Sequence, residues 1–427
     1  MHLKTLILSL CLLAAAGCAV NPVTGERELS LVGEDWELQV GQQNYAPLKQ
    51  AQGGEFKLDP GLVEYVREVG QRLAEVADRP LPYEFSVINE SVPNAWALPG
   101  GKIAINRGLL TAMDSEAELA AVLGHEIVHS AARHGAQGQT RSLLLQGAVL
   151  AGGIAVGAAT EDQRYAQAAL LGGMVGAQLI NQSYSRDAER EADRYGMIYM
   201  HRAGYNPRGA VELQETFLRL SEGRDQDRFS ALFSSHPPSR ERLENNRKML
   251  AELGDAGEIG RERYQRALAR LKQAEPAYEA YDAGRKALAD GDWNTALREA
   301  EKAISIEPGE AIFHVLKGDA LAERGRHADA VEAYGAALAR DDDWFYPHLK
   351  RGLSLAELGR RDRARADLSA SLQRLPTAVA HYALGVIERD DGNRTAAIEH
   401  FRIAAQSDTP VGQRARQALA EMGVNAP

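Results

Sequence analysis

Two histidines and a glutamate form a five-residue pattern, His125-Glu126-Ile127-Val128-His129, inside a segment with helical character. Because the two histidines are four residues apart, both imidazoles lie on one face of a helix, where they can share one ion. This geometry suits zinc. Such an ion lowers the pKa of a bound water to about 7, and Glu126 can take its proton as the water attacks a peptide carbonyl. Taken alone, the pattern also fits two surface histidines.

A catalytic zinc needs a third protein ligand and an open coordination position. Glu189 stands sixty residues after His129 at the start of another capped helical segment, and Asp193 follows one turn later. We predict Glu189 as the third ligand and Asp193 as the acceptor of a hydrogen bond that fixes the tautomer of a ligating histidine. Glu191 is the rival ligand. The alternative for these acids is a solvated helix face that pairs with Arg186, Arg190 and Arg194.

A downstream loop supplies two more polar candidates, His236 and Arg242, beside a Pro237-Pro238 turn. Either side chain could donate a hydrogen bond to the tetrahedral oxyanion next to the metal. A neutral His236 could instead occupy the fourth zinc position until substrate displaces it, or it could serve only the loop structure. His134, five residues after His129, is off the metal-facing row and is predicted to be a charge at a helix C-terminus. A purely structural zinc site is not favoured, since closed sites usually recruit cysteine.

Caps, periodicity and turn residues predict the elements that position these side chains. The helix with the clearest boundaries runs from Asp114 to Gly135, because Ser115 and Glu118 form a capping box and Gly135 is a stop. Gly135 and Gly196 are predicted to bound the two ligand helices so that histidines and acids point inward. That arrangement favours the first of the two candidate glutamates as the ligand.

Upstream of that helix, the pattern predicts helices beside a small sheet. A polar lead-in over residues 19 to about 50 precedes a helix over residues 60–77 and a strand over residues 83–89. A further extended segment over residues 96–105 is interrupted by Pro99-Gly100-Gly101, which would turn or bulge the chain.

Two soft apolar runs, residues 143–159 and 166–180, separate the two ligand helices. The first run has 17 residues, which is the length of the shortest membrane spans, and nine of them are Gly or Ala. A spanning helix is therefore not favoured. A close-packed helical hairpin, a mobile lid and a surface resting on lipid remain as alternatives for residues 143–180.

The last third of the chain repeats with a period of about 34 residues, which is typical of tetratricopeptide helical hairpins. Gly291, Gly325, Gly359 and Gly392 mark this period. Another glycine stands seven residues before each of these glycines, and an alanine stands five residues after each. Such small residues allow close helix contact. The earlier glycines are Gly284, Gly318, Gly352 and Gly385, and the alanines are Ala296, Ala330, Ala364 and Ala397. A capping helix is expected to cover the last apolar face.

The first residues read as an export signal, with Lys4, an apolar stretch over residues 6–16 and small residues before Cys18. This pattern resembles a bacterial lipobox, in which cleavage leaves an acylated cysteine at the new N-terminus. Cys18 is the predicted lipidation site, and Ala19 after it favours the outer membrane. Ordinary secretion into the periplasm is the alternative, because Ala15 stands where the usual pattern has Leu.

Composition excludes several classes of function. The 49 basic and 59 acidic residues give a net charge of -10, which argues against nucleic acid as a partner. The two cysteines, Cys11 and Cys18, both lie near the N-terminus, so the body of the protein forms no intramolecular disulfide. A hydrophobic content of 44% over 427 residues is that of a folded chain with more than one core.

These motifs together resemble the HtpX-like and BepA-like gluzincin peptidases, whose pattern is HExxH followed by ExxxD. Here the pattern is met at His125 to His129 and Glu189 to Asp193, and the resemblance covers residues 20 to about 250. Ser185-Arg186 looks like the lead into the ligand helix, and Ser235 to Pro238 with Arg242 like the downstream loop. The family's edge strand beside the cleft looks like Asn94, Ala95, Trp96, Ala97 and Leu98, which are the predicted substrate-binding residues.

The resemblance implies an α+β zinc metalloprotease domain, mostly helical with a small sheet, followed by an all-α tetratricopeptide-repeat solenoid. We expect a lipoprotein-type signal peptide over residues 1–17, the peptidase domain over 18–262 and a linker helix over 263–276. Four tetratricopeptide-like repeats over 277–410 and a capping helix and tail over 411–427 complete the chain.

We expect a zinc-dependent endopeptidase, with one Zn2+ per chain, that cleaves unfolded or misassembled envelope proteins. The repeats are expected to bind substrate or a protein partner such as the outer-membrane assembly machinery, and lipidated Cys18 to anchor the protein in the outer membrane. The alternative is an assembly factor or chaperone scaffold for outer-membrane proteins, with a mostly latent protease site. Soluble residence in the periplasm is the alternative location.

Overall fold

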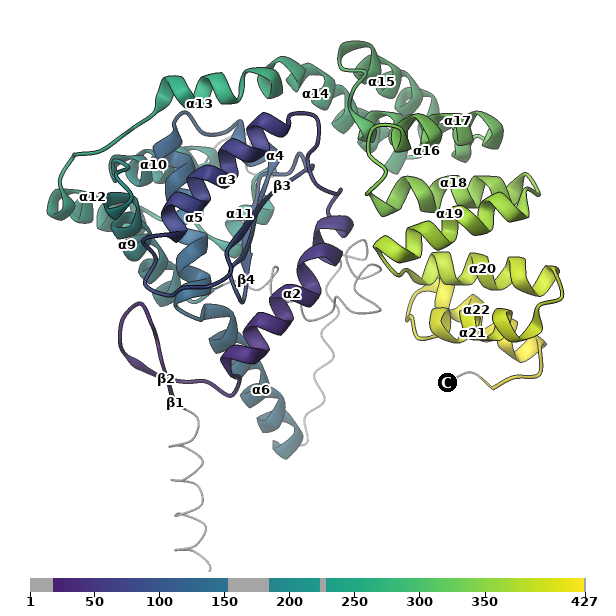
Figure 1. The fold of residues 1–427 in the computed structure, drawn as a ribbon, viewed down its shortest axis with the longest axis horizontal. Helices are drawn as coiled ribbons and strands as arrows, with labels where there is room; N and C mark the ends of the chain where they lie inside the picture. The colour runs from purple at the N-terminus through teal and green to yellow at the C-terminus, as the bar shows by residue number, and fades with distance from the viewer. Residues whose placement is uncertain (1–17, 153–183, 223–227, 426–427) are drawn as a thin grey trace, which may run out of the picture.

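The computed structural model describes residues 18–152, 184–222 and 228–425. It shows two regions side by side, which we call the mixed region (residues 18–267) and the repeat region (residues 269–425) (Figure 1). The predicted leader and most of the two predicted apolar runs lie outside the described residues. Among the described helices, none has the length and apolar character needed to cross a membrane.

A three-stranded sheet lies at the centre of the mixed region. Its strands are β3 (Glu84–Ile88), β4 (Ala95–Leu98) and β5 (Lys102–Asn106), in the order β3-β5-β4. β3 is parallel and β4 antiparallel to β5. The predicted turn joins β4 to β5, and Gly100 and Gly101 have φ values of 81° and 82° there, which residues with a side chain rarely adopt. β4 is therefore an edge strand, as predicted.

One face of the sheet is covered by α3 (Pro60–Ala74), the predicted first helix. The Asp59 side chain caps this helix by accepting a hydrogen bond from the Leu62 N–H at 3.1 Å. Gly70 lets the helix approach the sheet closely, since a Cβ added there would lie 2.6 Å from the Phe85 ring.

The other face is covered by α2 (Glu34–Ala51), which the sequence did not predict within its polar lead-in. Val40, Tyr45 and Leu48 of this helix pack against Trp96 and Leu98 of β4. The helix offers so few apolar side chains to the core that its periodicity is weak, and the sheet stabilises it through packing.

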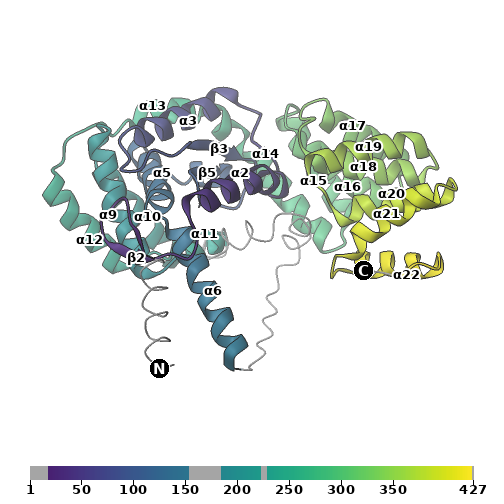
Figure 2. The same ribbon diagram turned by 60° about the horizontal axis from the view of Figure 1, so that its bottom comes forward.

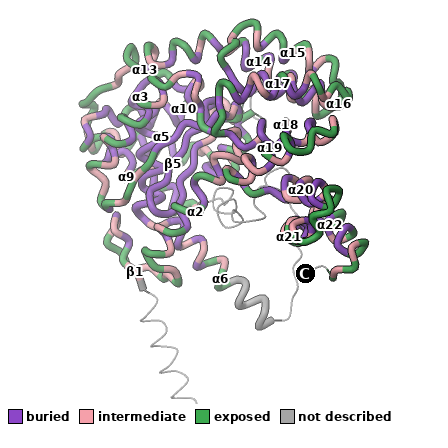
Figure 3. Tube along the Cα trace, turned by 45° about the vertical axis from the view of Figure 1, so that its right-hand side comes forward, coloured by how far each residue is buried: buried purple, intermediate pink, exposed green. Residues whose placement is uncertain are grey.

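The helix that carries the two histidines is α5 (Glu116–Ala131), buried along its whole length (Figure 3). The predicted capping box is present: the Ser115 hydroxyl accepts from the Glu118 N–H at 3.2 Å. The Glu118 carboxylate accepts from the Ser115 hydroxyl at 3.2 Å and from the Asp114 N–H at 3.1 Å, rather than from the Ser115 N–H. This cap fixes where the helix begins and so which residues face its neighbours.

The second ligand helix is α9 (Arg186–Arg202), capped by the Ser185 side chain, which accepts from the Ala188 N–H at 3.2 Å. The prediction that Gly196 bounds this helix is wrong, because Gly196 lies in its interior. A Cβ on Gly196 would lie 3.1 Å from the backbone nitrogen of His125, so the glycine allows α5 and α9 to touch backbone to backbone.

The predicted end of the first ligand helix at Gly135 is also wrong. α5 ends at Ala131, and α6 (His134–Gly152) begins after a break and projects from the body (Figure 2). At the break Arg133 has φ 64°, the one positive value of a non-glycine residue in the described ranges. Such a conformation costs about 1–3 kcal/mol, which contacts must offset. The Arg133 Nε donates to buried Glu37 at 2.6 Å and holds the break in place.

Shorter elements complete the mixed region. An N-terminal hairpin is formed by β1 (Cys18–Val20) and β2 (Arg27–Leu29). The remaining helices are α4 (Arg107–Leu110), α10 (Arg208–Glu222), α11 (Ser230–Ser235), α12 (Arg240–Leu253) and α13 (Arg261–Ala267).

The repeat region consists of antiparallel helical pairs, as predicted. Its helices are α14 (Ala269–Ala289), α15 (Trp293–Ile306), α16 (Ala311–Glu323), α17 (His327–Leu338), α18 (Phe345–Glu357), α19 (Arg361–Arg374), α20 (Ala378–Asp390), α21 (Arg394–Ala405) and α22 (Pro410–Glu421). The small residues lie at helix contacts: a Cβ added to Gly318 would be 2.5 Å from the Tyr334 ring. The expected linker helix over 263–276 is divided between two helices: its first residues belong to α13, and its later residues are continuous with the first repeat helix, because α14 continues through Pro276.

The two regions share one continuous cluster of buried apolar side chains and also touch through polar contacts. Lys57 pairs with Asp341 at 2.9 Å, and the Trp344 indole donates to the Gln50 carbonyl at 3.1 Å. Nearby, Glu310 of the repeat region is buried and accepts a hydrogen bond from the Asn89 amide at 3.1 Å. These contacts attach the residues before α16 and between α17 and α18 to the mixed region.

Candidate metal centre

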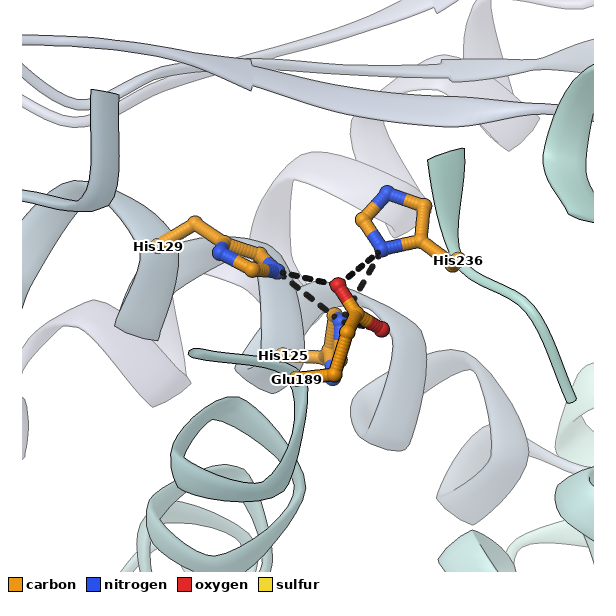
Figure 4. A group of neighbouring side chains, drawn as sticks. All are labelled: His125, His129, Glu189 and His236. Atoms are coloured by element: carbon orange, nitrogen blue, oxygen red, sulfur yellow. Dashed lines mark hydrogen bonds and ion pairs between the residues drawn. The ribbon is translucent and has the colours of Figure 1, made fainter. Parts of the chain in front are cut away.

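Four side chains converge between α5, α9 and the residue that follows α11: His125, His129, Glu189 and His236 (Figure 4). One nitrogen or oxygen of each lies within 4.8 Å of those of the other three, and all four residues are buried. The Nε2 atoms of His125 and His129 are 3.0 Å apart. Glu189 Oε1 lies 2.9 Å from His236 Nδ1 and 3.4 Å from His129 Nε2. The fold therefore brings the three predicted ligands together with the loop histidine.

Asp193 lies behind His125, one helical turn after Glu189. Its Oδ1 is 3.1 Å from His125 Nδ1. Burial alone would raise the pKa of Asp193, but the Arg242 guanidinium and the His125 ring hold that pKa below its ordinary value. Asp193 is thus an anion that accepts the Nδ1 proton of His125 and leaves Nε2 directed at the cluster.

Arg242 is engaged by the acidic residues of α9. Its Nε and Nη2 bind the two Asp193 oxygens at 2.6 and 2.7 Å, and its Nη1 lies 2.8 Å from Glu189 Oε2. Nη1 also donates to the Pro237 carbonyl at 3.2 Å. This geometry joins α9 to the His236 loop, and the predicted oxyanion role of Arg242 stays a prediction.

Glu126 lies in the wall of the same site. Its Oε1 is 3.6 Å from His236 Nε2, and its buried Oε2 has no hydrogen-bond partner among the described residues. Burial raises the pKa of Glu126, against the opposing effect of the His236 and His125 rings. A buried carboxylate oxygen left without a partner costs about 1–3 kcal/mol. Such an oxygen is suited to hold a water or a reacting group.

The surroundings of His129 were missed by the sequence analysis. The Tyr184 ring stacks on His129 with 3.8 Å between centroids and an interplanar angle of 17°. The prediction that His134 lies at a helix C-terminus is wrong: it is buried, starts α6, and places its Nδ1 2.8 Å from His129 Nδ1. Glu191, the rival ligand, lies outside the cluster and reaches His134 instead, with 3.4 Å between Glu191 Oε1 and His134 Nε2. A lone tyrosine before a cap gives no signal in sequence.

The predicted substrate strand borders the site, since Ala95 lines the same pocket as His125 and Glu126. The Asn106 N–H donates to the Asn94 carbonyl at 2.8 Å, so the alternate residues Ala95 and Ala97 direct their backbone groups away from β5. No strand within the described ranges pairs with β4 on that side. The side chains of Trp96 and Leu98 are buried under α2 and do not face the pocket.

The donor set fits a metal ion. Two imidazole nitrogens and one carboxylate from two helices, with a further position beside them, match the ligands of a catalytic metal. The Glu126 oxygen, which has no partner among the described residues, is suited to act as the base that such a site needs. The fold and the site thus define a metallopeptidase of the HExxH class.

Comparison with known proteins identifies the family. Residues 61–250 match peptidase family M48, and residues 281–346 and 349–411 match the tetratricopeptide repeat. The metalloprotease YcaL of Escherichia coli K12 is 32% identical over 188 residues, which cover 43% of this chain and 70% of that relative. The chain belongs to peptidase family M48, and the predicted resemblance and fold class are confirmed.

Two further relatives carry a more specific name. The putative beta-barrel assembly-enhancing protease of Vibrio cholerae is 33% identical over 199 residues, which cover 44% of this chain and 39% of the relative. The beta-barrel assembly-enhancing protease of Escherichia coli K12 is 31% identical over 201 residues, which cover 46% of this chain and 40% of the relative. The chain thus spans about two fifths of the length of these relatives.

Proposed function

We propose that this protein is a zinc-dependent endopeptidase with His125, His129 and Glu189 as metal ligands and Glu126 as general base. The observation that carries the proposal is the convergence of the ligand atoms within 4.8 Å of one another, beside a buried carboxylate oxygen that has no partner in the part of the chain that the structure describes. Imidazole nitrogens favour zinc over magnesium and calcium, which prefer oxygen ligands. We expect one ion per chain.

The residues of the site then have separate tasks. His125, His129 and Glu189 would hold the metal ion, which would supply Lewis-acid chemistry to the peptide carbonyl and to the attacking water. Glu126 takes the proton of that water on Oε2 and returns it to the leaving amine. Asp193, kept ionised by Arg242, holds the Nδ1 proton of His125 and so fixes the tautomer that ligates through Nε2.

An extended polypeptide would add to the free edge of β4 and pair with the backbone groups of Ala95 and Ala97. Pairing through the backbone demands little of the substrate sequence, which suits unfolded or misassembled proteins. The pocket beside Glu126 is mostly apolar and would take an apolar side chain next to the cleaved bond. Its lining includes Val122, Met197, Leu213 and Phe217.

His236 is the best candidate for the occupant of the fourth ligand position in the resting enzyme, because its Nδ1 lies within the ligand cluster. Substrate must then displace this ring. We expect His236→Ala to raise kcat/KM for a short unfolded peptide by about 2- to 10-fold, since the competent state becomes more populated. A fall in kcat of about 100-fold would instead assign His236 the role of oxyanion donor.

The deciding experiment compares the parent with Glu126→Gln, which keeps the side-chain volume and removes the base. Zinc content is measured by mass spectrometry on protein purified without chelators, and cleavage is measured on unfolded casein. We expect equal zinc in both proteins and a rate loss of about 10²- to 10⁴-fold in the variant. A parent without stoichiometric metal, or a variant as active as the parent, would contradict the proposal.

The setting we propose is the bacterial envelope, with substrates among outer-membrane β-barrel proteins. The names of the two assembly-enhancing relatives favour it. Lipidated Cys18 would anchor the protein in the outer membrane, and without lipidation it would be soluble in the periplasm. Metabolic labelling with a radioactive fatty acid tests the anchor, and Cys18→Ala should abolish the label.

The second candidate function is an assembly factor or chaperone scaffold whose protease site is mostly latent. His236 within the ligand cluster favours latency, and the tetratricopeptide repeats offer a surface for a partner such as the assembly machinery. Glu126→Gln separates the two functions. A scaffold keeps outer-membrane protein assembly at the parent level in cells carrying this variant, whereas a protease does not.

A further inference from the structure

His129 has a buried partner that the proposed mechanism does not use. Its Nδ1 lies 2.8 Å from Nδ1 of His134. Two ring nitrogens at this distance share one hydrogen, so one ring donates and the other accepts. If His129 ligates through Nε2, its proton is on Nδ1, and His134 must accept it and carry its own proton on Nε2.

Glu191 lies where that tautomer of His134 needs it. Glu191 Oε1 is 3.4 Å from His134 Nε2, and a carboxylate there favours the proton on that nitrogen. The same Oε1 accepts a hydrogen bond from the Asn21 amide at 2.8 Å. The contacts thus form a series, from His129 through His134 and Glu191 to Asn21, which we call the His129 relay.

The relay ends in the N-terminal hairpin. Asn21 is 1% exposed and follows directly after β1. Its side-chain oxygen accepts from the Val23 N–H at 2.9 Å, and its backbone carbonyl accepts from the Gly25 N–H at 2.8 Å. Asn21 therefore builds the hairpin turn and contacts the ligand helix α9 with one side chain.

The break between α5 and α6 brings His134 into contact with His129. In a continuous helix, His134 would follow His129 by five residues and point about 140° away from it, given about 3.6 residues per turn. The left-handed Arg133 reverses this and brings the two rings together. A backbone conformation that costs free energy, secured by the pairing of Arg133 with Glu37, thus delivers one side chain to a predicted metal ligand.

We propose that His134, supported by Glu191 and Asn21, is a positioning residue that fixes the tautomer and the orientation of His129. The N-terminal hairpin is then part of the support of the metal centre. This inference rests on the proposed function only in taking His129 as a ligand. His125 has the corresponding partner in Asp193, so each ligating ring is held from behind by a different group.

The test compares His134→Phe with His134→Asn in the full-length protein. Asn can place Oδ1 close to the position of the lost Nδ1 and so still accept from His129, whereas Phe fills the space without an acceptor. Zinc affinity is measured by competition with a chromophoric chelator, and the site geometry by the visible spectrum of the cobalt-loaded protein. We expect zinc binding to weaken about 10- to 100-fold in His134→Phe and to stay within about 3-fold of the parent in His134→Asn.

His201→Phe serves as the matched control, because His201 is exposed near the end of α9. It should leave both readouts unchanged. Glu191→Ala should weaken binding less than His134→Phe, and the double variant should equal His134→Phe alone, since both act through one series of contacts.

The outcomes separate the two proposals. A parent that binds no zinc would overturn the proposed function. A parent that binds zinc with a His134→Phe variant of equal affinity would overturn only this inference. Equal losses in His134→Asn and His134→Phe would show that the ring acts by packing alone, which also overturns it.

Discussion

The mixed region and the repeat region bury polar groups in opposite ways. In the mixed region, histidines, acids and an arginine gather at one point, and the cluster of His125, His129, Glu189 and His236 is buried. In the repeat region, helix contacts depend on glycine and alanine at the same position of each repeat, and buried polar side chains form small separate groups such as Asp319 with Tyr334. The mixed region therefore depends on one centre, whereas the repeat region depends on many equivalent contacts.

This contrast concerns stability as well as chemistry. Desolvated acids and imidazoles cost free energy unless an ion or hydrogen bonds compensate them. Stacked repeats approximate a sum of nearest-neighbour terms, so one lost contact acts locally. A change at the centre should affect the whole mixed region, and a change in one repeat should affect mainly its neighbours.

The largest expected effect on stability comes from removing the metal. An ion present at about 1,000 times its Kd stabilises the native state by about 4 kcal/mol, and that contribution is lost with a chelator. Calorimetry of the full-length protein with and without chelator should shift one unfolding transition to lower temperature and leave the other in place. The shifted transition is assigned by repeating the scan on Glu189→Gln, which should resemble the chelated parent.

A shift of both transitions on chelation would contradict the view that the mixed region and the repeat region unfold independently. The buried apolar cluster that the two regions share would then join them into one cooperative unit.

The next largest effect tests whether glycine is needed at the helix contacts of the repeats. Gly318→Ala places a Cβ 2.5 Å from the Tyr334 ring, so the helices must separate, at a cost of about 1–3 kcal/mol. Gly335→Ala in the partner helix of the same repeat is the control, since the nearest atom there is the Arg351 Nη1 at 3.8 Å. This control should gain up to about 1 kcal/mol because alanine favours a helix. Urea unfolding measures both, and equal effects would contradict the proposed role of glycine.

Much of the fold was predictable because its signals are local. The cap of α5 at Ser115, the turn at Pro99 to Gly101 and the period of the repeats each depend on residues close in sequence. The break at Arg133 depends on Glu37, 96 residues away, so no local pattern could reveal it. α2 was missed for a related reason, since it is stabilised mainly by packing on the sheet.

The candidate site likewise has features that local sequence predicts and features that depend on helix packing. The HExxH spacing alone predicts that His125 and His129 share a face. The choice between Glu189 and Glu191 depends on how α9 packs on α5, because residues two apart on a helix point about 200° apart. Sequence could only favour one of them, whereas the fold directs Glu189 to the cluster and Glu191 to His134.

The smallest expected effect concerns pH in the last repeat. His381 of α20 and His400 of α21 place their Nδ1 atoms 3.0 Å apart. Burial, together with the neighbouring His400, lowers the pKa of His381 to about 4. Because this pKa lies below the unfolded value of about 6.5, the folded state resists protonation. Stability is complete above about pH 6.5 and decreases as the pH falls toward about 4.

The half-buried ring sets the size of this loss at about 1 kcal/mol between pH 7 and pH 5, after allowance for solvent screening. Urea unfolding of the parent and of His381→Asn at both pH values measures it. The variant should lose this part of the pH dependence in the repeat transition, while the pH dependence of the transition of the mixed region should be the same in both proteins. An equal pH response of the repeat transition in both proteins would contradict the assignment to His381. If the parent and His381→Asn differ only in the pH dependence of the repeat transition, acid acts on the repeats locally, as a packing defect does.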